Sequence, residues 1–429
     1  MSTTLRSPYR RDFMDWLPAS GLRVQVVEKP RRPIPSDPEA SIEEALRHPL
    51  DSEPLEDLAR RALTATIVVT DATRPCPDQR LVSALLRRLQ SGGLRDEAIR
   101  IVVAIGMHRP STDAEKIEKL GKEIVSRFAV HDSEPLEPAM QVDLGVTPDG
   151  TPVRIDRRVV ETDLLISTGI IEPHQYAGFS GGWKTVGIGT AASATITRLH
   201  GMRFLEDPAV RLANTEGNPF LEEMRWIGER AGLRFVMNVS LNPEGSVDLV
   251  RAGHPESVHR DLSAIVKEQS VVPIEREWPI VIGGAGHPKD SNLYQATRMP
   301  TYLCFGRRPA VARGGAILVP AACPEGAGAG PGEKLFFDWL SSGSPDEILS
   351  RARTEGYPAG GQRAVMVAWA RMIADIAFIG TACPGIVEAC GMKAFPTLAE
   401  GVTWARGKTG SSDVLVVPRC LTTLPEVRD

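Results

Sequence analysis

Three observations predict an α/β protein made of two α/β domains with a cleft between them. The chain has 429 residues, which is long for one hydrophobic core and fits two domains. Short runs of β-branched residues alternate with segments of helical periodicity, as strands alternate with helices in such folds. Polar clusters follow directly after several of these runs, at the strand ends where ligands collect in open α/β sheets.

The first half of the chain contains three predicted strands, at residues 65–70 (ATIVVT), 99–106 (IRIVVAIG) and 162–169 (TDLLISTG). Residues 77–93 are predicted to form a helix stopped by glycines, and residues 112–121 a capped helix. The proline- and acid-rich segment at residues 33–54 is predicted to be a covering segment or loop.

A second unit begins near residues 271–278 (VVPIEREW), where a strand at 279–283 enters a glycine-rich turn and then a helix from about Ser291. Further strands in this half of the chain are predicted at residues 315–321, 376–380 and 413–418. We therefore predict a cofactor-tethering domain of residues 1–272, completed by residues 405–429, and a second α/β domain of residues 276–404.

Composition excludes several classes of protein. The chain is 42% hydrophobic and 24% charged with a net charge of −4, so neither nucleic acid nor a membrane is an expected partner. The N-terminus has no apolar signal-peptide core, and no run of about 18 apolar residues occurs, so we expect a cytoplasmic protein. Six scattered cysteines without a CxxC pair indicate neither a disulfide framework nor a zinc site.

Four polar clusters follow predicted strands and are expected to share one site. They are Asp71-Ala-Thr73-Arg74, Gly106-Met-His108-Arg109, the loop from His174 to Lys184, and Gly286-His287-Pro-Lys289-Asp290. Carboxyl ends of parallel strands meet at one edge of a sheet, and ligands collect there.

The loop PHQYAGFSGGWKTVGIGT at residues 173–190 allows several interpretations. It approaches the phosphate-binding P-loop pattern, but Trp183 replaces the second glycine, which disfavours a nucleotide triphosphatase. The amides of Ser180, Gly181 and Gly182 could still hold a phosphate, and a plain surface loop with Lys184 in solvent is the remaining alternative.

Four of the eight histidines lie in polar motifs. His108 and His174 follow separate strands and could flank one substrate, whereas His200 could bind a metal ion. His287 lies between glycine and proline and indicates a structural turn.

Together these motifs resemble the lactate racemase family of nickel-pincer enzymes. The matching segments are Asp71-Ala-Thr73-Arg74-Pro75, Gly106-Met-His108-Arg109-Pro110, His174-Gln-Tyr-Ala-Gly178-Phe-Ser180-Gly181-Gly182-Trp-Lys184, His200, and Asn292-Leu-Tyr294-Gln295. They occur in family order and fall in both predicted domains.

The resemblance implies a racemase or epimerase of 2-hydroxy acids, either lactate-like or extending to malate and larger or aromatic acids. Hydride would pass from the substrate to the cofactor and back through a 2-keto acid. The cofactor would be the nickel-pincer nucleotide (pyridinium-3-thioamide-5-thiocarboxylic acid mononucleotide nickel), supplied by cofactor-biosynthesis proteins.

The resemblance also implies roles for residues. Lys184 would tether the cofactor covalently, His200 would bind nickel, and His108 and His174 would be general bases, one for each enantiomer. The substrate-binding residues would be Arg74, Tyr294, Gln295 and Arg298, with Arg74 also suited to a cofactor phosphate. The ribose and phosphate would be held by Asp71, Thr73, Ser180, Gly181 and Gly182.

The sequence departs from the family pattern in three places. Arg298 stands where the family has lysine, and Ile188-Gly189 where it has proline-glycine. Tyr357 is the nearest candidate for the aromatic residue that covers the cofactor. These changes bear on the substrate more than on the reaction. The alternative function is a non-catalytic or hydrolytic phosphate-ligand-binding protein of the same fold.

Overall fold

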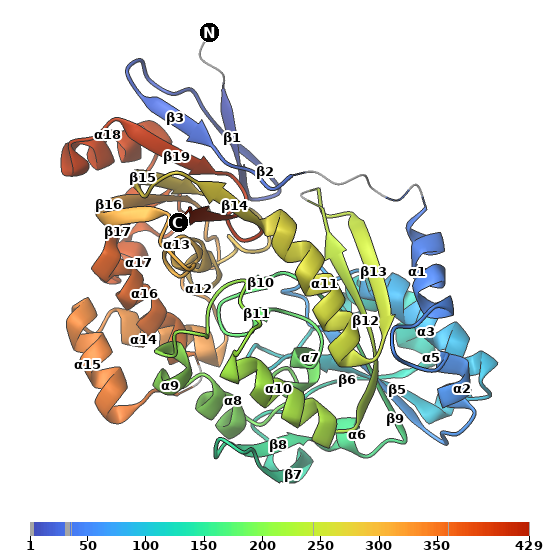
Figure 1. The fold of residues 1–429 in the computed structure, drawn as a ribbon. Helices are drawn as coiled ribbons and strands as arrows, with labels where there is room; N and C mark the ends of the chain where they lie inside the picture. The colour runs from blue at the N-terminus through green and yellow to red at the C-terminus, as the bar shows by residue number, and fades with distance from the viewer. Residues whose placement is uncertain (1–3, 31–34, 36, 243, 359, 429) are drawn as a thin grey trace.

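The computed structural model describes residues 4–30, 35, 37–242, 244–358 and 360–428, which form an α/β fold with two six-stranded sheets (Figure 1). The first sheet has the order β13-β12-β9-β4-β5-β6, and every neighbouring pair is parallel except β12 with the edge strand β13. Its strands are β4 (Ala65–Thr70), β5 (Ile99–Ala104), β6 (Ala129–Asp132), β9 (Leu164–Ile170), β12 (Leu233–Leu241) and β13 (Val247–Gly253).

Helices cover both faces of the first sheet, so its central strands are buried throughout. Along β4, Ile67 and Val69 pack into the core beneath α3 (Asp78–Ser91), whereas Val68 packs into the core on the opposite face. Such coverage explains why the strands read as continuous apolar runs. Helices near the first face are α1 (Pro38–Arg47), α2 (Leu55–Ala59), α4 (Asp113–Leu120) and α5 (Lys122–Arg127); those near the second are α7 (Lys184–Gly187), α10 (Pro219–Arg230) and α11 (Pro255–Ser270).

The second sheet has the order β18-β17-β16-β15-β19-β3 and is parallel throughout. Its strands are β15 (Trp278–Gly283), β16 (Val311–Pro320), β17 (Ala374–Ile379), β18 (Lys393–Phe395), β19 (Asp413–Val417) and β3 (Arg23–Val26). One face packs on α18 (Leu398–Thr409). The helices on the other side are α12 (Leu293–Ala296), α13 (Arg298–Cys304), α14 (Pro331–Leu340), α15 (Pro345–Glu355), α16 (Gly361–Ile373) and α17 (Pro384–Ala389).

The two sheets exchange segments at the chain ends, which differs from the domain division expected from the sequence. Residues 405–429 were expected to complete the first domain, but β19 lies in the second sheet between β15 and the N-terminal β3 (Figure 1). All five residues of β19 are buried, so the strand needs neighbours and coverage on both faces. The final strand β20 (Leu424–Val427) pairs with β14 (Val271–Ile274), which links the halves. The remaining domain limits stay predictions.

Two further local expectations differ from the structure. Helix α1 forms within the segment predicted to be a loop, with Asp37 accepting hydrogen bonds at its N-terminus; residues 33, 34 and 36 of that segment lie outside the described residues. The helix expected from Ser291 is divided into α12 and α13 at Thr297. Pro300 has no N–H to donate to the carbonyl of Ala296, which explains the division.

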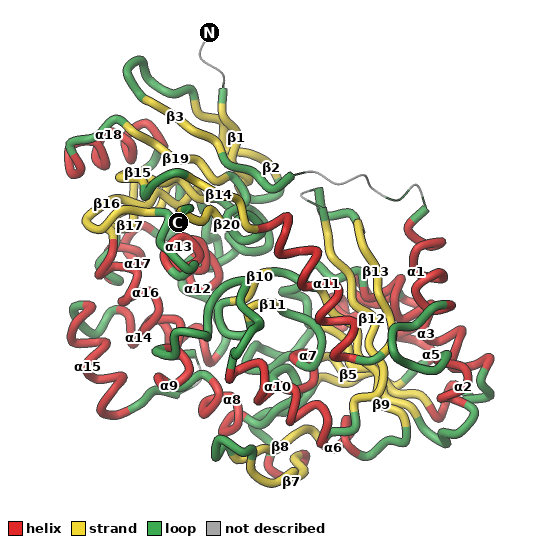
Figure 2. The backbone as a smooth tube through the Cα atoms, viewed as in Figure 1, coloured by secondary structure: helices red, strands yellow, loops and turns green. Residues whose placement is uncertain are grey.

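Small hairpins and turns complete the fold (Figure 2). They comprise the strand pairs β1 (Leu5–Tyr9) with β2 (Asp12–Trp16), β7 (Gln141–Val146) with β8 (Pro152–Asp156), and β10 (Pro173–His174) with β11 (Gly178–Phe179), and the short helices α6 (Arg157–Val160), α8 (Ser193–Leu199) and α9 (Met202–Leu205). Across the described ranges, no helix is both long and apolar enough to span a membrane.

Side chains from the second half of the chain hold the loops of the first. Tyr302 donates its hydroxyl hydrogen to the carbonyl of Pro173 over 2.6 Å, and the Lys289 ammonium donates to the carbonyl of Thr73 over 2.8 Å. Tyr357 bonds in the same way to the carbonyl of His200 over 2.6 Å. These bonds fix the strand-end loops of the first sheet against the second half.

Candidate active site

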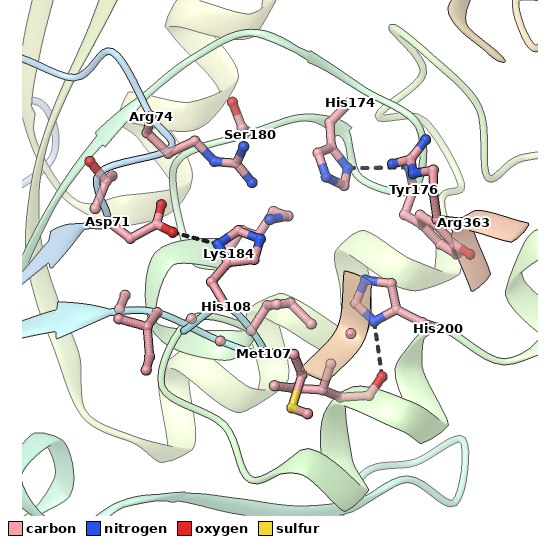
Figure 3. Close-up of a pocket in the computed structure, with 18 of the residues that line it drawn as sticks. Asp71, Arg74, Met107, His108, His174, Tyr176, Ser180, Lys184, His200 and Arg363 are labelled. Carbon is pink, nitrogen blue, oxygen red and sulfur yellow. Dashed lines mark hydrogen bonds and ion pairs between the residues drawn. The ribbon is translucent and has the colours of Figure 1, made fainter. Parts of the chain in front are cut away.

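A cavity of about 150 Å³ lies at the carboxyl ends of β4, β5 and β9 and gathers most of the predicted site residues (Figure 3). Its lining includes Asp71, Arg74, His108, His174, Ser180, Gly181, Lys184, His200, Tyr294 and Arg298. A neighbouring cavity of about 610 Å³ shares Asp71, Arg74 and His108 and adds Thr73 and Gln295. Three of the four polar clusters therefore meet at neighbouring strand ends, and the fourth supplies Lys289 to the larger cavity.

Asp71 and His108 form an ion pair at the ends of β4 and β5. The Asp71 carboxylate contacts Nδ1 of His108, and its other oxygen accepts from the Thr73 hydroxyl over 2.9 Å. Burial opposes ionisation of Asp71, but His108, Arg74 and Thr73 more than offset it and hold the carboxyl pKa below its usual range. This carboxylate, expected to bind a ribose, is thus engaged within the protein and leaves Nε2 of His108 with a free lone pair.

His174 is held by the hairpin turn between β10 and β11. Its Nδ1 accepts hydrogen bonds from the backbone amides of Tyr176 and Ala177, each over 3.2 Å. Gly178 pairs with His174 across the hairpin and has φ +72°, a conformation that favours glycine. An added Cβ there would overlap the Asn214 carbonyl, so the turn also needs glycine for space.

The Ser180–Gly182 turn is engaged internally. The amide of Ser180 donates to the carbonyl of Glu172 over 2.9 Å, and the amide of Gly182 donates to Oδ1 of Asn238 over 2.7 Å. Two of the three amides expected to hold a phosphate are therefore already bonded within the protein. The bulky Trp183 is buried and packs against Gly228, away from the cavity.

Lys184 begins the short helix α7 and lines the cavity. Burial, with repulsion from Arg74 and Arg298, lowers the pKa of its amine to about 7. An amine with that pKa is about half neutral at pH 7, so it is a far better nucleophile than an exposed lysine. The plain surface-loop interpretation, with Lys184 in solvent, is wrong.

His200 follows α8 and presents one ring nitrogen to the cavity. Its Nδ1 bonds to the carbonyl oxygen of Ile196 over 2.9 Å, and because a carbonyl only accepts, Nδ1 carries the proton. Burial lowers the pKa of His200 to about 4, so the ring is neutral at pH 7 with an unprotonated Nε2. The Tyr176 ring meets it edge-on at 4.9 Å. Within the described part of the chain, no three His, Cys, Asp or Glu side chains form a metal cluster.

The second half contributes polar groups that lack partners. Both amide atoms of Gln295 and Nε of Arg298 are buried without a hydrogen-bond partner among the described residues. Tyr294 and Arg298 both line the smaller cavity, as their spacing of four residues predicts. Buried polar atoms without partners are rare in proteins, so these groups indicate a polar ligand.

Arg363 on α16 is a site residue that the sequence did not reveal. It is 7% exposed and lines the smaller cavity, and its Nη1 donates to Oε1 of Gln175 over 2.8 Å. Its Nε also has no partner among the described residues. No motif marks this arginine, and only its position within an otherwise apolar helix (GQRAVMVAWA) could have drawn attention to it.

Tyr357 does not lie among the residues lining either cavity. Its ring packs edge-on against Trp339 at 6.0 Å, and its hydroxyl hydrogen-bonds to His200. In this structure it positions the His200 backbone, which is a different task from covering a cofactor. His287 lines the larger cavity at an exposed turn.

Comparisons with known proteins agree with this site. Residues 9–213 match the family described as "Lactate racemase N-terminal domain". The chain is 36% identical over 313 residues to a lactate racemase of Lactiplantibacillus plantarum, covering 73% of this chain and 72% of that protein. It is 32% identical over 323 residues to a lactate racemase of Thermoanaerobacterium thermosaccharolyticum, covering 74% of each chain.

Solved structures show the same fold. A lactate racemase apoprotein from Thermoanaerobacterium thermosaccharolyticum aligns with a TM-score of 0.88 over all of both chains, at 25% identity. A Thermotoga maritima protein aligns with a TM-score of 0.67 at 18% identity, covering 89% of this chain and 99% of the other, and supports the fold alone. From its sequence identity to named racemases over most of its length, the chain belongs to the lactate racemase family and is an isomerase.

Proposed function

We propose that this protein racemises or epimerises a 2-hydroxy acid by removing hydride from its Cα and returning it to the opposite face. The observation that carries the proposal is the convergence of Lys184, His200, His108 and His174 on one cavity (Figure 3). A nucleophilic amine, a metal-binding imidazole and a lone pair able to take a proton are what this reaction needs from a protein.

The residues present fit a nickel-pincer nucleotide. The half-neutral Lys184 amine is suited to covalent attachment, and the unprotonated Nε2 of His200 is suited to nickel. The partnerless groups of Gln295 and Arg298 are suited to the phosphate or carboxylates of such a ligand. When bound, the nucleotide would supply the hydride acceptor that an apolar carbon acid with an adjacent carboxylate requires.

The protein's own groups would bind the substrate and handle its proton. Arg74 and Arg298 would hold the substrate carboxylate, since each offers the planar fork that matches it. Nε2 of His108 would take the hydroxyl proton, with Asp71 stabilising the imidazolium that forms. The small cavity would exclude bulk water from these charges, which strengthens each interaction.

The substrate class follows from two considerations. Relatives at 32–36% identity are named lactate racemases, which favours lactate or a similar small acid. Arg298 and Arg363 add two guanidinium groups to the cavity, which would suit a second carboxylate, as in malate. Larger or aromatic 2-hydroxy acids are the third option. A panel of pure enantiomers followed by chiral analysis separates the three.

The test is to produce the protein together with the enzymes that build the cofactor. We expect racemase activity, bound nickel, and an intact mass that exceeds the sequence mass by one adduct. Lys184→Ala should remove both the adduct and the activity. Active protein with an unmodified Lys184 would refute the tether.

The alternative is a phosphate-ligand-binding or hydrolytic protein that keeps the fold. The cationic lining of the cavity is the observation in its favour. Under this alternative the co-produced protein would bind phosphate esters yet contain no nickel and racemise no member of the panel.

A further inference from the structure

The three histidines at the cavity differ in which ring nitrogen carries the proton. His108 gives Nδ1 to an ionised carboxylate and His200 gives Nδ1 to a carbonyl oxygen. Both partners only accept hydrogen bonds, so in both rings Nδ1 is protonated. Each of these two histidines therefore presents an Nε2 lone pair.

His174 has the opposite arrangement. The two groups that meet its Nδ1 are backbone N–H groups of Tyr176 and Ala177, which only donate. Nδ1 must accept, so the proton of the neutral ring is on Nε2. Turning the ring over would put a C–H against both amides and leave them without partners, and the hairpin pairing of His174 with Gly178 fixes where they point.

The charges around His174 work in the same direction. A second proton would have to bind Nδ1, where the two amides already point. Burial, followed by the positive charges of Lys184, Arg298 and Arg74, also holds the pKa of His174 well below its usual range. The ring therefore stays neutral, with an N–H on the nitrogen that remains for the cavity.

We propose that His174 is a hydrogen-bond donor to the substrate and that His108 alone exchanges the substrate proton. A general base needs a lone pair directed at the proton that it removes, which Nε2 of His108 has and Nε2 of His174 lacks. The inference rests on the proposed function and departs from the symmetric roles that the family resemblance implies for the two histidines.

The proton balance is simple under this assignment. The O–H bond of the 2-hydroxy acid breaks, and its proton forms an N–H bond at Nε2 of His108. The Cα–H bond breaks with transfer of hydride to the pyridinium-class acceptor of the proposed function, which leaves a 2-keto acid. In the return step hydride re-forms the C–H bond on the other face, and the same His108 returns the proton to the same oxygen.

The keto acid must then present its second face without moving its oxygen away from His108. Rotation about the carbonyl bond axis does this and exchanges the carboxylate with the side chain. The cavity has guanidinium groups from Arg74, Arg298 and Arg363, which come from different segments of the chain. A carboxylate would therefore find a cationic partner in more than one orientation.

Ring-nitrogen NMR tests the assignment without any reaction. Protein labelled with ¹⁵N-histidine would be measured with and without the cofactor, and the signals assigned from His108→Gln and His174→Gln. We expect a protonated Nε2 and an unprotonated Nδ1 in His174, and the reverse in His108. A protonated Nδ1 in His174 would overturn the proposal. The outcome does not depend on whether any acid is racemised.

Kinetics of the half-reaction give a second readout. In racemisation the equilibrium constant is one, so kcat/KM stays equal in both directions for every variant, and keto acid formation must be followed from each enantiomer separately. We expect His108→Gln to slow it from both enantiomers by about 10²–10⁴-fold. His174→Gln, which keeps a side-chain N–H donor, should slow both equally and by about tenfold or less.

The two-base arrangement gives a different pattern. If each variant blocks keto acid formation from one enantiomer only, the proposal is wrong. His131→Gln, at an exposed position on β6 outside both cavities, is the matched control and should leave both half-reactions unchanged. If the wild-type protein forms no keto acid from any 2-hydroxy acid, the proposed function fails, while the NMR result still decides the tautomers.

Discussion

The lowered pKa of Lys184 predicts unusual reactivity of its amine. At pH 7 a pKa of about 7 leaves roughly half of the amine neutral, whereas the ordinary lysine value of 10.5 leaves about 0.03%. Since the neutral amine is the nucleophile, Lys184 should react up to about 10³-fold faster than an exposed lysine, before any steric restriction. This difference would direct attachment of a cofactor to one lysine of the chain.

Competitive labelling measures this reactivity. Cofactor-free protein would be exposed briefly to a small amine-acylating reagent between pH 5 and 11, and modification of Lys184 compared with that of the exposed Lys122 by peptide mass spectrometry. The sign follows from deprotonation: modification of Lys184 should rise with pH and reach half its plateau near pH 7. Lys184→Met identifies the peptide.

The cause of the shift can be tested with Arg74→Gln. Burial is the largest contribution to the lowered pKa of Lys184, and Arg74 is the first charge that adds to it. Removing that charge should move the midpoint of modification to higher pH while leaving Lys122 unchanged. A wild-type midpoint near pH 10 would refute the argument that the site lowers this pKa.

Three other changes have expected outcomes. Asp71→Asn should lower racemase activity by about 10²-fold or more, since it removes the charge that stabilises protonated His108, and Asp71→Ala at similar folded stability checks that the charge is responsible. Arg298→Lys should shift the ratio of kcat/KM between lactate and malate or larger acids, and an unchanged ratio across the panel would show that Arg298 does not select the substrate. Gly178→Ala should destabilise the protein by about 1–3 kcal/mol or more in denaturant unfolding, since it combines φ +72° with an overlap on Asn214; Gly245→Ala at φ +85° in open space is the control for strain alone.

The position of the site could be predicted because it depends on local sequence. Buried parallel strands give continuous β-branched runs, and ATIVVT at residues 65–70 is β4 to the residue. The residues that follow β4, β5 and β9 were expected to meet because strand ends collect ligands, and the sheet order places these three strands side by side.

Other features depend on contacts distant in sequence and leave no local pattern. Strand β3 joins the second sheet beside β19, almost 400 residues away, and nothing in RVQV specifies that partner. Arg363 enters the site only because α16 packs beside α13. The amides of Ser180 and Gly182 looked available in the sequence, but the carbonyl of Glu172 and the side chain of Asn238 occupy them in the fold.

The charges of the smaller cavity explain why so many of its groups lack partners. Its cationic side chains are Arg74, Lys184, Arg298 and Arg363, and its carboxylates are Asp71 and Glu333. Both carboxylates are already bonded, Asp71 to His108 and Glu333 to the amide of Gly330.

The protein therefore encloses more positive than negative charge. Burial and mutual repulsion lower the pKa of Lys184 to about 7 and that of Arg298 to about 10. An anionic ligand removes this repulsion and satisfies the partnerless atoms at once, so a phosphate-bearing group should bind tightly and raise the unfolding temperature. A substrate carboxylate entering afterwards meets arginines whose charges are partly balanced. The order of binding, first the phosphate-bearing group and then the hydroxy acid, thus follows from the charges of the empty cleft.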